Sequence, residues 1–204
     1  MGFLPQMGVL EGMTNLSTRR NLELLPTVTA VQQGKLSSTG VFARDGIGEA
    51  GLGVKFGLTS NLTFDFTANP DFSQIESDRP QIEVNQRFPL LYPELRPFFL
   101  EGAEIFRIQG AITYVHTRTI VDPQFGAKLT GKIGKTTLGL LVTNDQAPGK
   151  VDDRLAPAFG RTAHSVVVRA KYDLYSNAYV GAMVTDWEFL AGHSRLALVD
   201  GQFR

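Results

Sequence analysis

The sequence predicts an all-β chain that forms part of an antiparallel transmembrane β-barrel, and three observations favour this fold class. Apolar and polar residues alternate with a period of two along several segments of about ten residues. Tight turns rich in glycine, serine and asparagine separate these segments, and helical periodicity is essentially missing. No run of about 20 apolar residues is present, so strands rather than helices would have to cross a bilayer.

The first hairpin is predicted at residues 51–68. GLGVKFGL, at 51–58, directs its large apolar side chains to one face and Lys55 to the other. TSN, at 59–61, supplies a turn, and LTFDFTA, at 62–68, returns with leucine and phenylalanine opposite Asp65. The result is a hairpin with one apolar face and one polar face.

Two further hairpins follow the same pattern. GAKLTGKI turns at Gly134-Lys135 into TTLGLLVTN, and the alternating segment 166–174 turns at Ser176-Asn177 into AYVGAMVTDWEF. Weaker strand candidates lie at 21–32 and 111–120, and the terminal SRLALVDGQFR also alternates. We therefore expect about nine strands, which is a partial barrel. Because the chain stops inside a strand-like segment and begins without a secretory signal, we expect a fragment of a larger protein.

The polar face carries repeated full charges, which suit either solvent or a water-filled lumen. A soluble β-sandwich or a lipocalin-like barrel also alternates with period two, so this alternative stays open. An aromatic girdle is expected at the strand ends, where five aromatic residues fall: Tyr172, Tyr175, Tyr179, Trp187 and Phe189.

Composition removes several classes of function. Twenty basic and 20 acidic residues cancel, so nothing in the charge favours nucleic acid as a partner. Cysteine is absent, which excludes disulfides and thiolate metal sites in this chain. GAKLTGKI has Ile133 where a phosphate-binding loop needs serine or threonine, and the three histidines lack metal-ligand spacing. No cofactor is therefore expected, apart from the calcium alternative described next.

Residues 70–110 are predicted to form a long ordered loop between hairpins, rich in proline, phenylalanine and glutamate. Three interpretations are open: an oxygen-ligand calcium site, a glycosidase carboxylate pair, or a structural loop in which arginine and glutamate pair while aromatic residues anchor it. The structural interpretation is favoured because aromatic content promotes packing. Its candidate residues are Asp71, Glu76, Asp78, Arg87, Glu94, Arg96, Phe98, Phe99 and Glu101.

A family resemblance is carried by residues 52–102. The succession of a glycine-rich strand, LTSNLT, NPDFSQIE, RF and YPELRPFFLEG resembles the bacterial family known as domain of unknown function 5916. The downstream FGAKLTGKIGKTTLGLL and the N-terminal RNLELLPTVTA are also similar to family strands. The segment TYVHTRTI departs from the YSRRIG-like segment of many members.

The resemblance implies an outer-membrane β-barrel that usually follows a domain like the family 9 carbohydrate-binding modules. It implies a bacterial outer-membrane location, with membrane lipid as partner and glycan bound through an upstream domain. The expected function is therefore that of a pore, receptor or membrane anchor in an envelope protein. The alternative is a membrane-associated carbohydrate-active hydrolase, for which Glu94 and Glu101 are the carboxylates to test.

Overall fold

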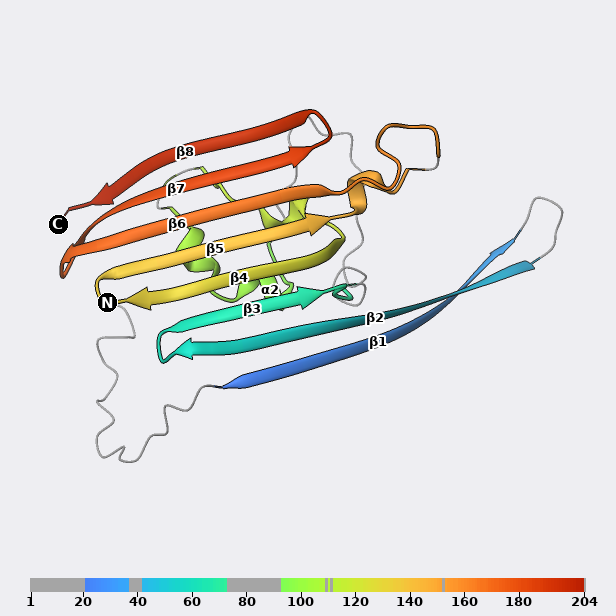
Figure 1. The fold of residues 1–204 in the computed structure, drawn as a ribbon, viewed down its shortest axis with the longest axis horizontal. Coiled ribbons are helices and arrows are strands. Elements are labelled where there is room, and N and C mark those ends of the chain that lie inside the picture. The colour runs from blue at the N-terminus through green and yellow to red at the C-terminus, as the bar shows by residue number, and fades with distance from the viewer. Residues whose placement is uncertain are drawn as a thin grey trace.

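The described residues form one antiparallel sheet of eight strands, each paired with the next along the chain (Figure 1). A computed structural model of the protein describes residues 21–36, 42–72, 93–108, 110, 112–151 and 153–203. The strands are β1 (Leu22–Leu36), β2 (Phe42–Thr59), β3 (Leu62–Ala68), β4 (Pro123–Ile133), β5 (Thr136–Asp145), β6 (Ala163–Tyr175), β7 (Ala178–Phe189) and β8 (Gly192–Gln202). The all-β antiparallel class predicted from the sequence is confirmed.

The three predicted hairpins are β2–β3, β4–β5 and β6–β7, with the expected turns. The candidate strand at 111–120 is wrong, because this segment contains the short 3-10 helix η2 (Thr117–Thr119). The described part of the chain therefore has eight strands instead of about nine. Within it β1 and β8 form the two edges and do not pair with each other, so the sheet is open.

The two ends of the sheet differ in the length of their connections. At one end, the short-turn end, two-residue turns at 60–61, 134–135 and 176–177 join the strands. The other end, the long-loop end, carries the connections 37–41, 69–122, 146–162 and 190–191. The connection 69–122 is the predicted inserted loop, and it extends past residue 110 because β4 begins only at Pro123.

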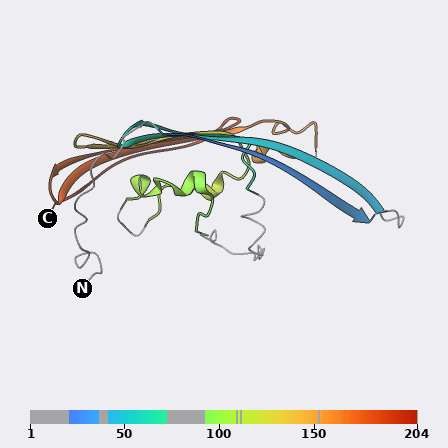
Figure 2. The same ribbon diagram turned by 90° about the horizontal axis from the view of Figure 1, so that it is seen from below.

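The sheet is arched, and the described helical part of the insertion lies under its concave face (Figure 2). Two one-turn helices of the insertion, α2 (Pro97–Leu100) and α3 (Ala103–Phe106), lie beneath the strands there. The main buried cluster joins this segment to the sheet. It consists of Phe99, Phe106, Ile120, Leu141, Val167 and Met183.

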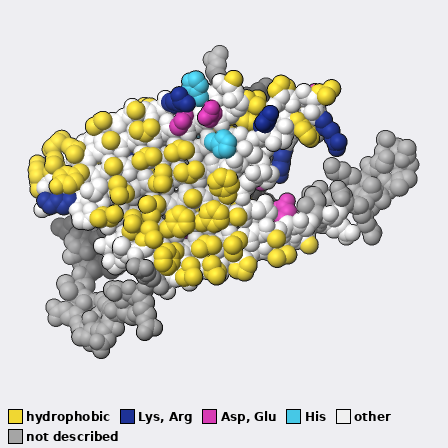
Figure 3. Space-filling view, viewed as in Figure 1, with side chains coloured by type: hydrophobic (Ala, Val, Ile, Leu, Met, Phe, Trp, Pro, Cys, Tyr) yellow, Lys and Arg dark blue, Asp and Glu magenta, His cyan; other side chains and the backbone are white. Residues whose placement is uncertain are grey.

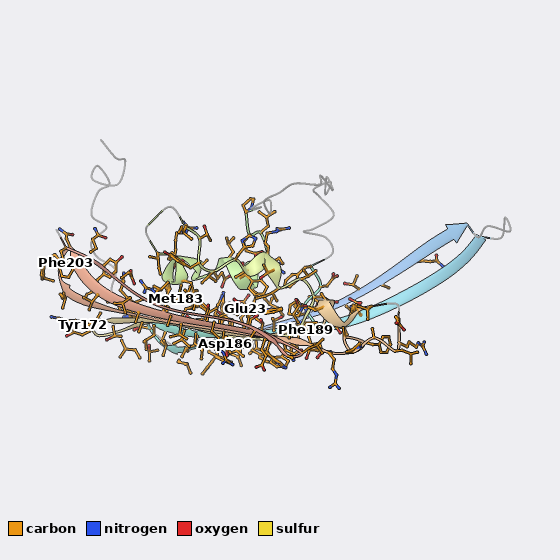
Figure 4. The ribbon with its side chains drawn as sticks, turned by 90° about the horizontal axis from the view of Figure 1, so that it is seen from above. Glu23, Tyr172, Met183, Asp186, Phe189 and Phe203 are labelled. Atoms are coloured by element: carbon orange, nitrogen blue, oxygen red, sulfur yellow. The ribbon has the colours of Figure 1, made fainter. Side chains whose placement is uncertain are left out.

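The strand register assigns alternate residues to the two faces. Lys128, Arg169 and Met183 lie on the concave face, and Figure 4 shows Met183 on the side of the helices and Asp186 on the opposite side. An aromatic girdle would have to lie on the convex face. The prediction is wrong for Tyr179, Trp187 and Phe189, because the strand register puts them on the concave face with Met183. Tyr172 lies on the convex face.

The convex face is apolar over most of its area, as the space-filling view shows (Figure 3). Its exposed side chains include Leu140 at 37%, Val168 at 43%, Val184 at 52% and Val199 at 82%. Charged residues on this face gather at the long-loop end of β7 and β8, where Asp186 pairs with Arg195. Among the described residues, no helix has both the length and the apolar character needed to cross a membrane.

Candidate functional site

The candidate site is the insertion where it packs on the concave face, and its local structure follows from YPELRPFFLEG. Pro97 opens α2 at the first helical turn, where a missing N–H costs no hydrogen bond, and Arg96 before it is extended. Gly102 separates the two helices with a φ of 69°. Glycine adopts this left-handed conformation without strain, so the chain can turn from α2 into α3. The segment predicted as a long ordered loop therefore contains two short helices.

Glu94 and Arg96 form a clamp at the base of the insertion. Arg96 is 1% exposed, and it donates from Nε to Glu94 Oε1 at 2.9 Å and from Nη2 to Oε2 at 2.8 Å. The same guanidinium donates to the carbonyls of Ile120 at 2.6 Å and Thr117 at 2.9 Å. Glu94 and Arg96 lie on the outgoing limb of the insertion, which precedes α2, whereas Thr117 and Ile120 lie on the returning limb, which leads into β4. The clamp therefore joins the two limbs.

Further bonds fix the Glu94 carboxylate as an anion. The Thr117 hydroxyl donates to Oε2 at 2.6 Å, and the backbone N–H groups of Leu95 and Arg96 donate to Oε1 at 3.1 and 3.0 Å. Burial alone would raise the pKa of Glu94, but the hydrogen bonds from Arg96 and Thr117 outweigh it and lower the pKa to about 2. A carboxyl with this pKa is ionised near neutral pH and is a poor general acid.

Aromatic rings enclose the arginine of the clamp. The Arg96 guanidinium carbon lies 4.3 Å from the ring centre of Phe99 and 5.0 Å from that of Phe72. Phe98 meets Phe99 edge to face, with ring centres 5.0 Å apart. Cation–π contacts and ring packing therefore stabilise the desolvated guanidinium.

Lys128 of β4 attaches the insertion to the sheet. Its side chain is 2% exposed, and Nζ donates to the carbonyls of Phe98 at 2.5 Å and Glu101 at 2.7 Å. Asp65 of the neighbouring strand lies 3.4 Å from the same Nζ. The Glu101 side chain turns outward to pair with Lys55 of β2, so Glu101 contacts two strands.

Two glycines of the concave face make room for the insertion. A β-carbon at Gly126 would lie 2.8 Å from the Phe98 ring, and one at Gly139 would lie 2.8 Å from Ile105 and from the Phe106 ring. These distances are shorter than carbon atoms tolerate, so larger residues would displace the aromatic rings. Glycine at these positions thus permits close packing of the helices on the strands.

Both limbs of the insertion are also held at the long-loop end. The Thr29 hydroxyl of β1 donates to Asp71, and the backbone N–H of Asn69 donates to the Gln124 carbonyl at 2.7 Å. On the returning limb, the backbone N–H groups of Val121 and Asp122 donate to the buried Asp145 carboxylate of β5, at 2.9 and 2.8 Å. The insertion therefore starts and ends on adjacent, fixed points of the sheet.

The structure places six of the nine predicted loop residues. It brings Glu94, Arg96 and Phe99 into one cluster, with Phe98 against Phe99, and it sets Glu101 and Asp71 against separate strands. Glu76, Asp78 and Arg87 lie outside the described residues. The glutamates 94 and 101 take different partners, Arg96 and Lys55, and neither pairing presents a free acid beside a free base.

Sequence reasoning missed several residues that build this site. Thr117 and Asp145 had no signal, because each acts through contacts with residues far along the chain. Gly126 had a weak signal, since a glycine on the polar face of a strand marks a close approach of other groups.

A cavity of about 450 Å³ lies mostly within the insertion, and only Lys128 and Leu141 of the sheet contribute to its wall. Glu94, Phe99, Lys128 and Leu141 line it together with part of the returning limb. Among the described residues, no group of three or more histidine, aspartate or glutamate side chains is arranged to hold a metal ion. Glu94 and Lys128 at the cavity wall already have protein partners.

The fold and the site together define a class: an antiparallel sheet whose concave face holds an insertion by buried charges and glycines. Residues 18–120 match the model of a family described as Domain of unknown function (DUF5916). Because this match covers half of the 204 residues, the chain belongs to that family. The match includes β1 to β3 and nearly all of the insertion. No curated protein and no solved structure matches the chain.

Proposed function

We propose that this chain is part of an outer-membrane β-barrel, with lipid against its convex face and the insertion inside its lumen. The single observation that carries the proposal is the polarity of the two faces. The convex face is apolar and exposed, whereas the concave face holds Lys128 and Arg169, each 2% exposed and paired. A soluble sheet would bury its apolar face, while a membrane barrel turns that face to lipid.

The height of the apolar band supports lipid as the occupant of the convex face. On β6 the convex positions run from Val166 to Leu174, which is about 26 Å along a strand at roughly 3.3 Å per residue. An outer-membrane barrel presents an apolar band about 25 Å tall, and strand tilt reduces the height of the present band somewhat. The band is also bounded by charge at the long-loop end, where Asp186 and Arg195 pair.

Fixation of the insertion favours a receptor or membrane anchor over a wide pore. Glu94, Arg96 and Lys128 are bonded within the insertion or between it and the sheet, and removing the insertion would leave the Lys128 charge short of partners. A segment fixed in this way would narrow any lumen that the sheet encloses. The low pKa of Glu94 also disfavours a glycosidase acid at this position.

Fractionation of the full-length protein tests the membrane proposal. We expect the protein in the outer-membrane fraction, extractable only with detergent, and migrating faster on gels before heating than after it. Recovery in the soluble fraction without detergent would overturn the proposal.

A matched pair of substitutions tests which face meets lipid. Val168→Lys places a charge in the middle of the convex face, where lipid exposure costs about 2–4 kcal/mol. Ser194→Lys makes the same charge on the concave face of β8, at an exposed residue opposite Trp187 of β7. We expect Val168→Lys alone to reduce membrane assembly. If Val168→Lys assembles as well as the parent protein, lipid does not cover this face.

The hydrolase alternative is tested in the full-length protein with Glu94→Gln and Glu101→Gln. Our proposal predicts that neither change removes a glycan-hydrolysing activity, because both carboxylates serve in structural ion pairs. Loss of such an activity, with detergent extraction and gel mobility unchanged, would support the enzyme.

A further inference from the structure

We infer that the long-loop end of the sheet faces the cell exterior and the short-turn end faces the periplasm, an inference that rests on the proposed function. The first support is the asymmetry of the connections. Two-residue turns close one end, whereas the other end carries the connections 69–122 and 146–162. Outer-membrane barrels have short periplasmic turns and longer extracellular loops.

The charged boundary of the convex face lies at the same end. The register aligns Asn144, His164, Glu188 and His193 in one row across β5 to β8, and the next row contains the Asp186–Arg195 pair. Beyond these rows, towards the short-turn end, the convex residues are apolar as far as Leu138 on β5 and Leu174 on β6. Charged side chains favour water over hydrocarbon, so these rows mark the edge of the lipid at the long-loop end.

The β1–β2 hairpin shows how far the long-loop end extends beyond the bilayer. Its pairs continue from Thr27–Gly51 to Leu36–Phe42, whereas β3 pairs with β2 only between Leu52 and Thr59. The hairpin therefore projects from the long-loop end about 30 Å beyond β3, at roughly 3.3 Å per residue (Figure 1). A bilayer core about 30 Å thick cannot hold both the band and this extension.

The orientation has a consequence for the insertion. Its two limbs meet the sheet at the long-loop end, where Asn69 bonds Gln124 and Asp145 binds Val121 and Asp122. The insertion therefore enters the lumen from the cell surface and folds inward along the concave face. The cavity lined mostly by the insertion would then be reached by molecules outside the cell, a position that suits a receptor.

Single-cysteine labelling tests the orientation directly, because the chain contains no cysteine of its own. Leu155→Cys lies in the long connection between β5 and β6, at a residue that is 93% exposed, and Asn177→Cys lies in an exposed two-residue turn. The probe is a membrane-impermeant maleimide, applied to intact cells and to cells with a permeabilised outer membrane. We expect Leu155→Cys to react fully in intact cells and Asn177→Cys to react only after permeabilisation.

A second pair, Gln32→Cys and Ser60→Cys, repeats the comparison on the β1–β2 hairpin and the β2–β3 turn, so that one poorly folding variant does not decide the result. The orientation would be wrong if the two turn variants reacted in intact cells and the two long-loop-end variants reacted only after permeabilisation. If the protein still needed detergent for extraction, the barrel proposal itself would not be affected. Reaction of both members only after lysis, with the protein in the soluble fraction, would overturn the proposed function and the orientation with it.

Discussion

The concave and convex faces of strands β4 to β7 share one backbone but follow opposite rules. On the concave face Lys128 and Arg169 are almost fully buried, and each meets a carboxylate: Asp65 for the lysine and Asp200 for the arginine. On the convex face valine and leucine side chains remain exposed, as at Val168. Burial of a charge is tolerated where partners replace water, and on the concave face these partners are carboxylates of other strands and, for Lys128, backbone carbonyls of the insertion.

Glycine placement sharpens the same comparison. Gly126, Gly139 and Gly181 all lie on the concave face, and a β-carbon at each would meet another group at 2.8 Å. At Gly181 that group is the Arg169–Asp200 ion pair, so the third glycine accommodates charge while the other two accommodate rings. The concave face is therefore shaped around particular side chains.

The largest expected effect comes from breaking the clamp with Arg96→Ala. This change leaves the Glu94 carboxylate buried without its partner and removes two bonds to the returning limb. Loss of one member of a buried ion pair costs about 3–5 kcal/mol, and we expect a loss of that size in the free energy of unfolding. Urea unfolding in detergent micelles, followed by far-ultraviolet circular dichroism, measures it.

The control for the clamp is Arg195→Ala at the convex boundary, where the arginine side chain is 61% exposed and pairs with Asp186. Exposed pairs contribute about 0–1 kcal/mol, so the control should unfold nearly as the parent does. Equal losses in the two variants would mean that the Arg96 clamp has no special role.

Acidification tests the same clamp through its carboxylate. The folded pKa of Glu94, about 2, lies below the unfolded value, so its contribution is complete above about pH 5 and is lost as the pH falls towards 2. The loss is of the order of 3 kcal/mol. Unfolding free energies measured between pH 6 and 2 should fall less steeply for Glu94→Gln than for the parent protein. The same pH dependence in both proteins would contradict a lowered pKa of Glu94 in the folded state.

A smaller effect is expected from Gly139→Ala, which adds one methyl group beneath Ile105 and Phe106. Because its β-carbon would lie 2.8 Å from both side chains, the helix must shift, at a cost of about 1–3 kcal/mol. Gly53→Ala is the matched control, since its β-carbon would lie 3.4 Å from Leu25, an ordinary contact. Chemical denaturation of both variants decides the comparison, and equal stabilities would show that Gly139 does not seat the insertion.

Much of the sheet could be predicted from the sequence because its pattern is local. Alternation in GAKLTGKI and the turn at Gly134-Lys135 fix β4 and β5, and the register follows from turn length. The prediction of a strand at 111–120 was wrong. β-branched residues such as Thr117 and Thr119 favour strands, but here they form a 3-10 turn within the returning limb. Tertiary bonds to Arg96 override the local preference there.

The site was predictable in part, for the same reason. Glu94 and Arg96 lie two residues apart, so their pairing needs only local geometry. The hydrogen bond from Lys128 to the carbonyl of Phe98 joins a strand to an insertion far away in the sequence, and no spacing rule predicts it. The three girdle residues on β7 were misplaced because position near a strand end does not specify a face, whereas register does.

The smallest expected effect separates two lysines on the concave side of β4. Lys128 is 2% exposed beneath the insertion, whereas Lys132, four residues towards the short-turn end, is 48% exposed and pairs with Asp173 at 2.5 Å. We expect Lys132→Ala to change the unfolding free energy by less than about 1 kcal/mol, because solvent screens the pair. Lys128→Ala should cost several times more, since two backbone carbonyls and Asp65 lose their donor. Urea unfolding of the two variants measures the ratio of their losses in unfolding free energy. A ratio near one would mean that cover by the insertion does not determine how much a lysine on this face contributes to stability.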